Sequence, residues 1–435
     1  PRLQNRYQQL LMAHLSTAHQ TAAGLRALPG CSQAFAASQA AWRFYSNPRV
    51  TLPQLATPLI ESAKAGVNQS CKDWALIALD WCLLHYGKHV SKRDRIVMAR
   101  STDLGYKLLT ALLISDQHGS PLAPVCLELS ASNGIHSTRS AKALKSSTAL
   151  DGLEAVMGHV EKLQLGRRLA YIVDREGDSI GHLRKWDSTG RKFLVRAKDN
   201  PRVMYEGREQ RLVDAAAQVP LLKTRTVKFH GADAVQFTGE TRVVLKRPAR
   251  THRVINGEAK HRNISGAPLE LRLIVCEVRN ANGTVLAQWL LLSNLPSEVS
   301  AATLALWYYW RWRIESYHKL LKSAGQQVEY WLQDDAATLA RRLTVAAMAG
   351  VVVWQLARDT RSEAVALRSV LVQLSGRLMK KGEGQPGFTE PALLAGLGVL
   401  LSMLHLLESR RITDLKNLVH QLLPTLMPTR PVLSG

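Results

Sequence analysis

Three carboxylates stand out in this sequence because of the residues around them. Asp80 ends the apolar run "WALIALD", and Asp174 ends the apolar run "LAYIVD". Glu315 is the one acid in the aromatic and basic stretch "WYYWRWRIESYHKLLKSAG", residues 307–325. Ligand-binding side chains of α/β sheets emerge at strand ends, where the frame is rigid. Taken singly, an Asp at a strand end is more often a cap or a turn former than a catalyst.

Glu315 has neighbours that favour a chemical role. On a helix with about 100° per residue, four side chains fall within about 60° of one another: Tyr308, Arg311, Glu315 and Lys322. The opposite side carries an apolar stripe that we expect to be buried: Leu306, Trp310, Ile314, Tyr317 and Leu321. A solvated face with an i,i+4 ion pair between Arg311 and Glu315 explains the charges, but it does not explain why Tyr308 lies among them.

Three carboxylates brought together repel one another unless a cation neutralises them, and oxygen-only ligands suit Mg²⁺ or Mn²⁺. Two such ions about 3.5–4 Å apart activate a water or a 3′-hydroxyl and stabilise the leaving oxygen in phosphodiester displacement. Cations such as Arg313 and Lys319 beside the ions would hold DNA phosphates. The stretch therefore favours the hypothesis that Glu315 is a metal ligand among phosphate-binding groups.

The charge balance agrees with a polyanionic partner. The 435-residue chain has 57 Lys and Arg against 34 Asp and Glu, a net charge of +23. Cations spread over a folded chain attract phosphates, so we favour nucleic acid over a merely soluble, ribosome-binding or membrane-surface protein. Five scattered cysteines without a CxxC pair argue against a zinc module or a disulfide scaffold, and they favour a reducing cytoplasm. The apolar run 343–357 is short and flanked by arginines, which predicts a buried helix rather than a membrane span.

The order of apolar runs predicts an α/β fold, a mixed sheet with helices on its faces. Strands are expected at 74–80, 106–115, 122–130, 169–174 and 192–198, with helices at 139–165 and 180–186. Residues 200–285 alternate in short runs between turns, which indicates an inserted β-rich subdomain. A further strand at 287–296 precedes a helical remainder that is divided at 380–387.

These patterns predict four regions. Residues 1–70 form an N-terminal helical DNA-binding region, with a helix closing at Asn47-Pro48. Residues 71–199 and 286–330 form the core, and 200–285 form the insertion. Residues 331–435 form a helical region for dimerisation, in which the apolar run 393–407 is either a partner surface or part of the protein's own core.

The spacing of Tyr308, Arg311, Glu315 and Lys322 within "YYWRWRIESYHKLLK" resembles the signature of the DDE transposases of bacterial insertion sequences, of the insertion-sequence-four family and Tn-five type. The similarity reaches "ALDWCLLHY", "IVDREGDS", "KFLVRAK", "QWLLLSNLP" and "WRFYSNPRV". It covers about residues 1–330 and is concentrated in the islands around the three acids.

This resemblance implies a ribonuclease-H-like core with a β insertion between the second Asp and the Glu. It also implies cut-and-paste transposition on double-stranded DNA: nicking at the transposon end, hairpin formation, reopening by water and strand transfer. By position, Asp80, Asp174 and Glu315 would be the catalytic ligands of two Mg²⁺ ions, with Mn²⁺ as a substitute. Tyr308, Arg311 and Lys322 would contact DNA phosphates.

Two further expectations concern the details of this site. Trp289 matches the place where relatives hold a flipped base on an aromatic ring, although core packing explains a strand tryptophan equally well. Trp81 and Cys82 follow the first Asp, where the family has small hydroxyl residues. Asp94 and Asp103 are therefore alternatives to Asp80 as the first ligand.

We accordingly expect an active, homodimeric transposase of the bacterial cytoplasm, acting at the nucleoid. Because the sequence starts at Pro1 without an initiating Met, a second hypothesis is a DNA-binding regulator or inhibitor that keeps the fold without cutting. A third is a nuclease of repair or recombination that does not need paired ends.

Overall fold

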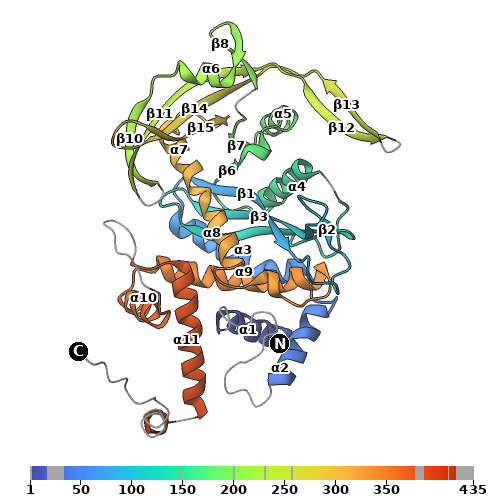
Figure 1. The fold of residues 1–435 in the computed structure, drawn as a ribbon, viewed down its shortest axis with the longest axis vertical. Helices are drawn as coiled ribbons and strands as arrows, with labels where there is room; N and C mark the ends of the chain where they lie inside the picture. The colour runs from blue at the N-terminus through green and yellow to red at the C-terminus, as the bar shows by residue number, and fades with distance from the viewer. Residues whose placement is uncertain are drawn as a thin grey trace, which may run out of the picture. The chain divides into compact units, whose positions relative to one another are not determined.

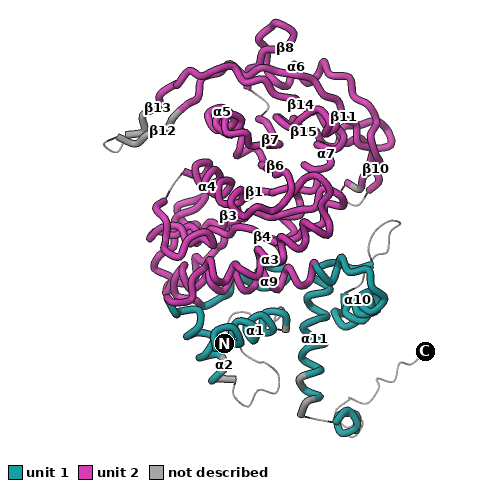
Figure 2. Tube along the Cα trace, turned by 180° about the vertical axis from the view of Figure 1, so that it is seen from behind, with its two compact units in different colours: residues 1–47, 320–332, 355–435 teal, residues 48–319, 333–354 magenta. Residues whose placement is uncertain are grey.

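The computed structural model describes residues 2–16, 34–146, 148–198, 201–229, 232–255, 258–377, 387–409 and 411–417. The chain divides into two compact units (Figure 2). One unit comprises residues 48–319 and 333–354 and contains the large sheet. The other comprises residues 1–47, 320–332 and 355–435, and its described part is helical.

A single large mixed sheet organises the first unit (Figure 1). Its strand order is β5-β4-β3-β1-β6-β7-β15-β14-β11-β8-β9, with β2 paired to β3 and β10 paired to β11. The strands are β1 (Trp74–His85), β2 (Ile96–Val97), β3 (Leu104–Ser115), β4 (Pro121–Ala131), β5 (Gly134–Ser137), β6 (Arg168–Val173), β7 (Lys192–Arg196), β8 (Arg202–Tyr205), β9 (Arg208–Arg211), β10 (Leu222–Phe229), β11 (Ala232–Leu245), β14 (Leu269–Arg279) and β15 (Val285–Ser293). This arrangement confirms the predicted mixed α/β class.

Strand β1 is the centre of the sheet's buried part. Its residues 75–79 are completely buried, as expected for an apolar run with both faces covered. It pairs antiparallel with β3 and parallel with β6. The prediction that the strand ends at Asp80 is wrong, because pairing with β3 continues to His85 opposite Gly105. Pairing with β6 does stop at Leu79, opposite Val173.

The predicted meander of adjacent strands is confirmed by the neighbours β1, β3 and β4. The helix expected at 139–165 is shorter, since α4 runs over Ala149–Lys162. It begins there because the Thr148 hydroxyl caps it by accepting from the Asp151 N–H at 3.2 Å. The next predicted helix is present as α5 (Ile180–Ser188).

Residues 200–285 are rich in strands, as expected, but they do not make a separate sheet. Strands β14, β11, β8 and β9 continue the main sheet, because β15 pairs with β7 on one side and β14 on the other. The short helix α6 (Leu212–Ala217) lies among them in sequence. Only β12 (Ala249–Ile255) and β13 (Glu258–Ile264) form a sheet of their own within the described residues.

Helices cover both faces of the β1–β3–β4 region (Figure 1). Helix α3 (Leu52–Ser70) packs on β4, where Gly66 lies so close to Leu122 that an added Cβ would stand 3.3 Å from the Leu122 Cβ. Helix α4 lies on the other face. The structure thus places α3 with the sheet, although the sequence grouped it with the N-terminal helices.

Helix α9 (Ala336–Arg358) contains the apolar run that we expected to be a buried helix. Within the described ranges it alone is long and apolar enough to cross a bilayer. Of its most apolar window, 78% is buried inside the structure, which confirms the expected burial.

The signature segment forms two consecutive helices, α7 (Ala301–Trp310) and α8 (Trp312–Leu321), joined at Arg311. The predicted division into an apolar buried stripe and a polar opposite face is only partly correct. Leu306 and Trp310 are partly exposed, whereas Tyr308 and Arg311 are each 2% exposed. A simple solvated face is therefore excluded for these two residues.

In the helical unit, α1 (Arg2–Ser16) and α10 (Ser362–Leu374) each pack on α11 (Glu390–Ser409). Helix α2 (Ala34–Ser46) ends just before Asn47-Pro48, as predicted, because the residue before a proline disfavours helical geometry. A short helix η2 (Val328–Tyr330) also belongs to this unit. Most of the expected break at 380–387 lies outside the described residues.

Candidate active site

Three carboxylates from three distant segments converge on one guanidinium. Arg311 Nη1 donates to Asp80 Oδ2 at 2.8 Å. Arg311 Nη2 donates to Asp174 Oδ2 at 3.0 Å and to Glu315 Oε1 at 2.9 Å. The structure therefore brings together the three acids singled out in the sequence.

The parallel register of β1 and β6 explains why the two aspartates meet. The last paired positions are Leu79 and Val173, so Asp80 and Asp174 follow side by side where the parallel pairing of β1 and β6 stops, Asp174 just after β6 and Asp80 within β1. Asp174 Oδ1 also accepts from the Arg175 N–H at 2.7 Å and caps the short helix η1 (Arg175–Gly177). Asp80 Oδ1 accepts from the Trp81 N–H at 2.8 Å, which fixes its carboxylate.

Glu315 is positioned by contacts at both ends of its helical turn. His318 Nε2 lies 3.2 Å from the hydroxyl of Thr110, the residue opposite Asp80 on β3. Arg313 Nε donates to the Gly119 carbonyl at 3.1 Å. Gly119 has a φ of +63° and faces Trp310 so closely that an added Cβ would meet the indole at 2.4 Å. These contacts anchor the helix to β3 and to the turn after it.

Two more side chains support Asp174. The Tyr308 hydroxyl donates to Asp174 Oδ1 at 3.1 Å. Burial raises the pKa of Tyr308 to about 12, so this phenol stays a neutral donor near pH 7. Arg196 Nη1 lies 3.7 Å from the same oxygen.

Arg196 was not singled out from the sequence, although a signal for it existed. Its neighbour Val195 pairs with Val173 on the adjacent parallel strand. The next residue of each strand, Arg196 on one and Asp174 on the other, therefore reaches the same sheet edge. The position of Arg196 could therefore have been predicted from the pairing register of β6 and β7, although no sequence motif indicates it.

The surroundings shift the pKa values of the three acids in different directions. Burial raises the pKa of Asp80 and of Glu315, with the Arg311 charge opposing it in both. Burial also acts on Asp174, but Arg311, the Arg175 N–H, Tyr308 and Arg196 together outweigh it and lower the pKa. Burial opposes the charge of Arg311 as well, yet Tyr308 and the three carboxylates keep its pKa above the ordinary value. The arginine is therefore a permanent cation of the site.

As the side chains stand, no group of three or more His, Cys, Asp or Glu within the described ranges is arranged to hold a metal ion. The guanidinium occupies the position toward which the three carboxylates turn. The donors themselves fit Mg²⁺ or Mn²⁺ in kind, because they are carboxylate oxygens around a common cation. Their side chains are 22% exposed for Asp80 and 31% for both Asp174 and Glu315, which leaves them open to solvent.

Of the other residues expected at the site, Trp289 lies next to Tyr308, whereas the two lysines lie near the end of α8 and just beyond it. Trp289 on β15 is half-buried, with its ring centroid 6.3 Å from that of Tyr308. Lys319 is exposed at the end of the sheet-containing unit. Lys322 belongs to the other unit, where its ammonium lies 2.9 Å from Glu329 Oε1.

The two alternatives to Asp80 have other surroundings. Asp94 accepts from the Tyr106 hydroxyl at 2.5 Å and from the Ala336 N–H at 2.7 Å. Asp103 takes part through its backbone in a turn with Arg100 and Met98. Asp80 is thus the candidate that shares a cation with Asp174 and Glu315.

Comparison with known proteins adds little to this description. No protein-family model matches the chain. No curated protein matches it either. Among solved structures, the chain is similar to a piggyBac transposase in a synaptic complex with hairpin DNA, studied by cryo-electron microscopy. The identity is 10% and the TM-score 0.36, over 99% of this chain and 76% of the other.

Proposed function

We propose that this protein is a cut-and-paste DNA transposase whose phosphodiester chemistry takes place at Asp80, Asp174 and Glu315. The observation that carries the proposal is the convergence of these carboxylates on Arg311 at 2.8–3.0 Å. The strands inserted between Asp174 and Glu315 support it, since the resemblance to insertion-sequence transposases implies a ribonuclease-H-like core with an insertion there. The net charge of +23 supports DNA as the partner.

Asp80, Asp174 and Glu315 would hold the divalent ions, and Tyr308 and Arg196 would keep Asp174 in place and ionised. Bound Mg²⁺ or Mn²⁺ supplies activation of a water or a 3′-hydroxyl and stabilisation of the leaving oxygen. The raised pKa of Asp80 and Glu315 means that both lose their protons at a higher pH than usual. Ion binding would therefore weaken on acidification.

Arg311 connects DNA binding with ion binding in this proposal. Its guanidinium neutralises the carboxylates now, and the same fork suits a DNA phosphate. If the Arg311 guanidinium binds a DNA phosphate instead of the three carboxylates, these carboxylates lose their neutralising cation. They can then bind a divalent cation. DNA and metal would then favour each other's binding, as linkage requires.

Trp289 is our candidate for holding a flipped base during hairpin formation. It lies next to Tyr308, which hydrogen-bonds Asp174, and its ring is partly accessible. A base that leaves the stack recovers part of the lost energy on an aromatic face.

We further propose a homodimer formed through the C-terminal helical region, acting on DNA in the bacterial cytoplasm. Helix α11 supports this proposal because it exposes large apolar side chains: Val399 at 41%, Met403 at 48% and Leu404 at 51%. A second copy covering this face would remove these side chains from water.

A second candidate function is a DNA-binding regulator that does not cut. The observation that favours it is the engagement of all three carboxylates by Arg311, an arrangement in which they are not set to hold a metal ion. In a regulator, DNA binding would leave this arrangement unchanged.

A plasmid that carries the gene with its flanking inverted repeats tests the proposal. With Mg²⁺, the purified protein should excise the element, and Glu315→Gln should abolish excision while DNA binding persists. Glu270→Gln removes an exposed carboxylate that pairs with Arg242, so it is the matched control and should cut normally. Binding without cutting by the wild-type protein would favour the regulator, and cutting without the repeats would favour a nuclease.

A further inference from the structure

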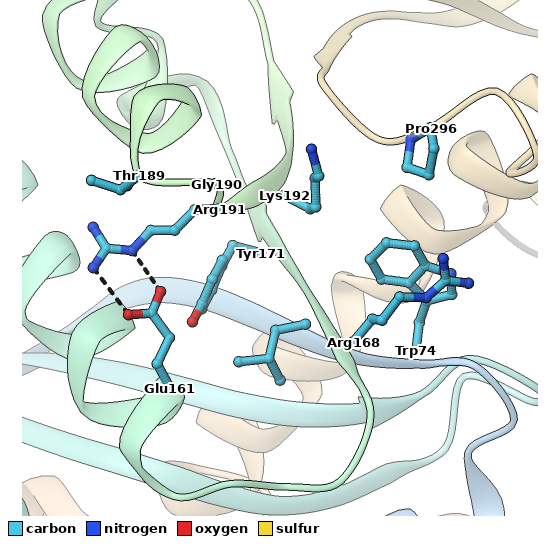
Figure 3. A pocket seen from close by; sticks show the side chains of 10 residues that line it. Trp74, Glu161, Arg168, Tyr171, Thr189, Gly190, Arg191, Lys192 and Pro296 are labelled. Atoms are coloured by element: carbon cyan, nitrogen blue, oxygen red, sulfur yellow. Dashed lines mark hydrogen bonds and ion pairs between the residues drawn. The ribbon is translucent and has the colours of Figure 1, made fainter.

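A second site lies at the opposite ends of the same parallel strands. A cavity of about 380 Å³ opens where β1, β6 and β7 begin (Figure 3). Trp74 starts β1, Arg168 starts β6 and Lys192 starts β7. Because these strands are parallel, the cavity is at their amino-terminal edge, whereas Asp80 and Asp174 lie just beyond the far end of the pairing between β1 and β6.

Two cations at this cavity are available to a ligand. The Arg168 guanidinium lies 4.2 Å from the centroid of the Trp74 ring, which holds its plane in place. Its ion pair with Glu298, at 2.8 Å, joins side chains that are 51% and 59% exposed, so it is weak and easily exchanged. The Lys192 ammonium has no hydrogen bond or ion pair to another side chain described in the structure, and Figure 3 shows it pointing away from the strand.

The remaining walls are fixed and partly apolar. Arg191 donates to both Glu161 oxygens, at 2.6 and 3.1 Å, so this pair neutralises itself. Leu169, Tyr171 and Pro296 add apolar surface. The cavity thus combines one cation that is unpaired among the described side chains, Lys192, and one exposed, weakly paired cation, Arg168, with a partly apolar wall.

We propose that this cavity binds a phosphate group carried on a sugar, as in a nucleotide unit. A guanidinium fork and an ammonium are the groups that bind phosphate oxygens in proteins, and the apolar wall suits the attached ring. The ligand is either a DNA backbone phosphate or the phosphate of a free mononucleotide. In the first case the protein holds DNA at a second place, away from the cutting site, which goes beyond the proposed function.

The salt dependence of DNA binding tests the first source. Fluorescence anisotropy of a labelled random duplex, from about 50 to 200 mM salt, gives the slope of log K against log salt. If a backbone phosphate binds here, Lys192→Ala and Arg168→Gln each lower the slope by about 0.9, the change expected for one lost contact. Lys64→Ala, an exposed lysine of α3 in the same unit, should leave it unchanged.

Thermal stabilisation by deoxyadenosine monophosphate tests the second source. Lys192→Ala should remove the stabilisation and Lys192→Arg should retain it if the cavity takes free nucleotides. Equal melting temperatures of the ligand-free variants show that folding is intact. If Lys192→Ala and Arg168→Gln change neither the slope nor the stabilisation, the proposal is overturned.

These outcomes are separable from the proposed activity. Glu315→Gln should abolish excision without altering the effect of Lys192→Ala on the slope. A protein that never cuts DNA but shows the slope change would refute the transposase function and leave this second site intact.

Discussion

The guanidinium of Arg311 contacts the Asp80 carboxylate at 2.8 Å although 231 residues separate them in sequence. The same group reaches Asp174 and Glu315, and its own Nε is buried without a hydrogen-bond partner in the structure. The side-chain hydrogen bonds of Arg311 therefore come from its two terminal nitrogens, and its guanidinium also lies near the rings of Tyr308 and Trp312. The contacts tie the junction of α7 and α8 to the ends of the parallel strands, and they make Arg311 the resident cation of the site.

Removing that cation should destabilise the fold. Arg311→Gln leaves three carboxylates close together, and breaking a buried ion pair costs about 3–5 kcal/mol. Because the carboxylates remain partly exposed, we expect the lower end, about 3 kcal/mol in the free energy of unfolding by urea. Lys319→Gln removes a cation from an exposed position of the adjoining helix α8 and should cost under about 1 kcal/mol. Equal losses for the two variants would contradict the role given to Arg311.

The three acids should respond differently to neutralisation in the absence of metal. A raised pKa in the folded state means that ionised Asp80 and Glu315 are less favourable there than in the unfolded chain. Asp80→Asn and Glu315→Gln should therefore keep or raise the melting temperature at pH 7, whereas Asp174→Asn should lower it, since the pKa of Asp174 is depressed. A drop for all three would show that hydrogen bonding to the charged forms outweighs the burial cost.

The pH dependence of folding stability follows from the same pKa shifts of Asp80, Glu315 and Asp174. For Asp80 and Glu315 the folded state binds more protons between the ordinary and the raised pKa, so their contribution to stability falls as the pH rises through that window. For Asp174 the contribution is present above its ordinary pKa and is lost as the pH falls toward the depressed one. The melting temperature of Glu315→Gln relative to wild type should accordingly rise with pH above the ordinary glutamate pKa. A difference that is constant with pH would refute this.

Divalent ions and DNA should bind cooperatively. We expect the affinity for Mn²⁺, followed by electron paramagnetic resonance, to rise about 10-fold when duplex DNA is present. Arg311→Gln should bind Mn²⁺ more tightly than wild type without DNA and gain less from adding it. The same Mn²⁺ affinity in both proteins, with and without DNA, would mean that Arg311 and the ion do not compete.

Several features of the site could be predicted from the sequence, and the exceptions have physical causes. Asp80 and Asp174 were found because apolar runs precede them, and Glu315 was found because of its neighbours. The continuation of β1 beyond Asp80 was missed because "WCLLH" is stabilised as a strand by pairing with β3, a contact distant in sequence.

The burial of Arg311 and Tyr308 was missed for a related reason. A helical wheel sorts side chains by the polarity of an isolated helix, whereas these two are buried in the folded chain, where they hydrogen-bond to Asp80 and Asp174. The joining of the inserted strands to the main sheet depends likewise on β7 pairing with β15, which no local pattern indicates.

Iron-directed cleavage of the polypeptide tests the central claim most directly. With DNA bound, Fe²⁺ replaces Mg²⁺, added hydrogen peroxide is reduced at the ion to hydroxyl radicals, and ascorbate returns the Fe³⁺ to Fe²⁺. Mass spectrometry then maps the cut peptides. The account predicts cuts next to Asp80, Asp174 and Glu315 together, suppressed by excess Mg²⁺ and absent in Glu315→Gln. Cuts confined to other segments, or cuts at these three that persist in Glu315→Gln, would contradict a shared ion.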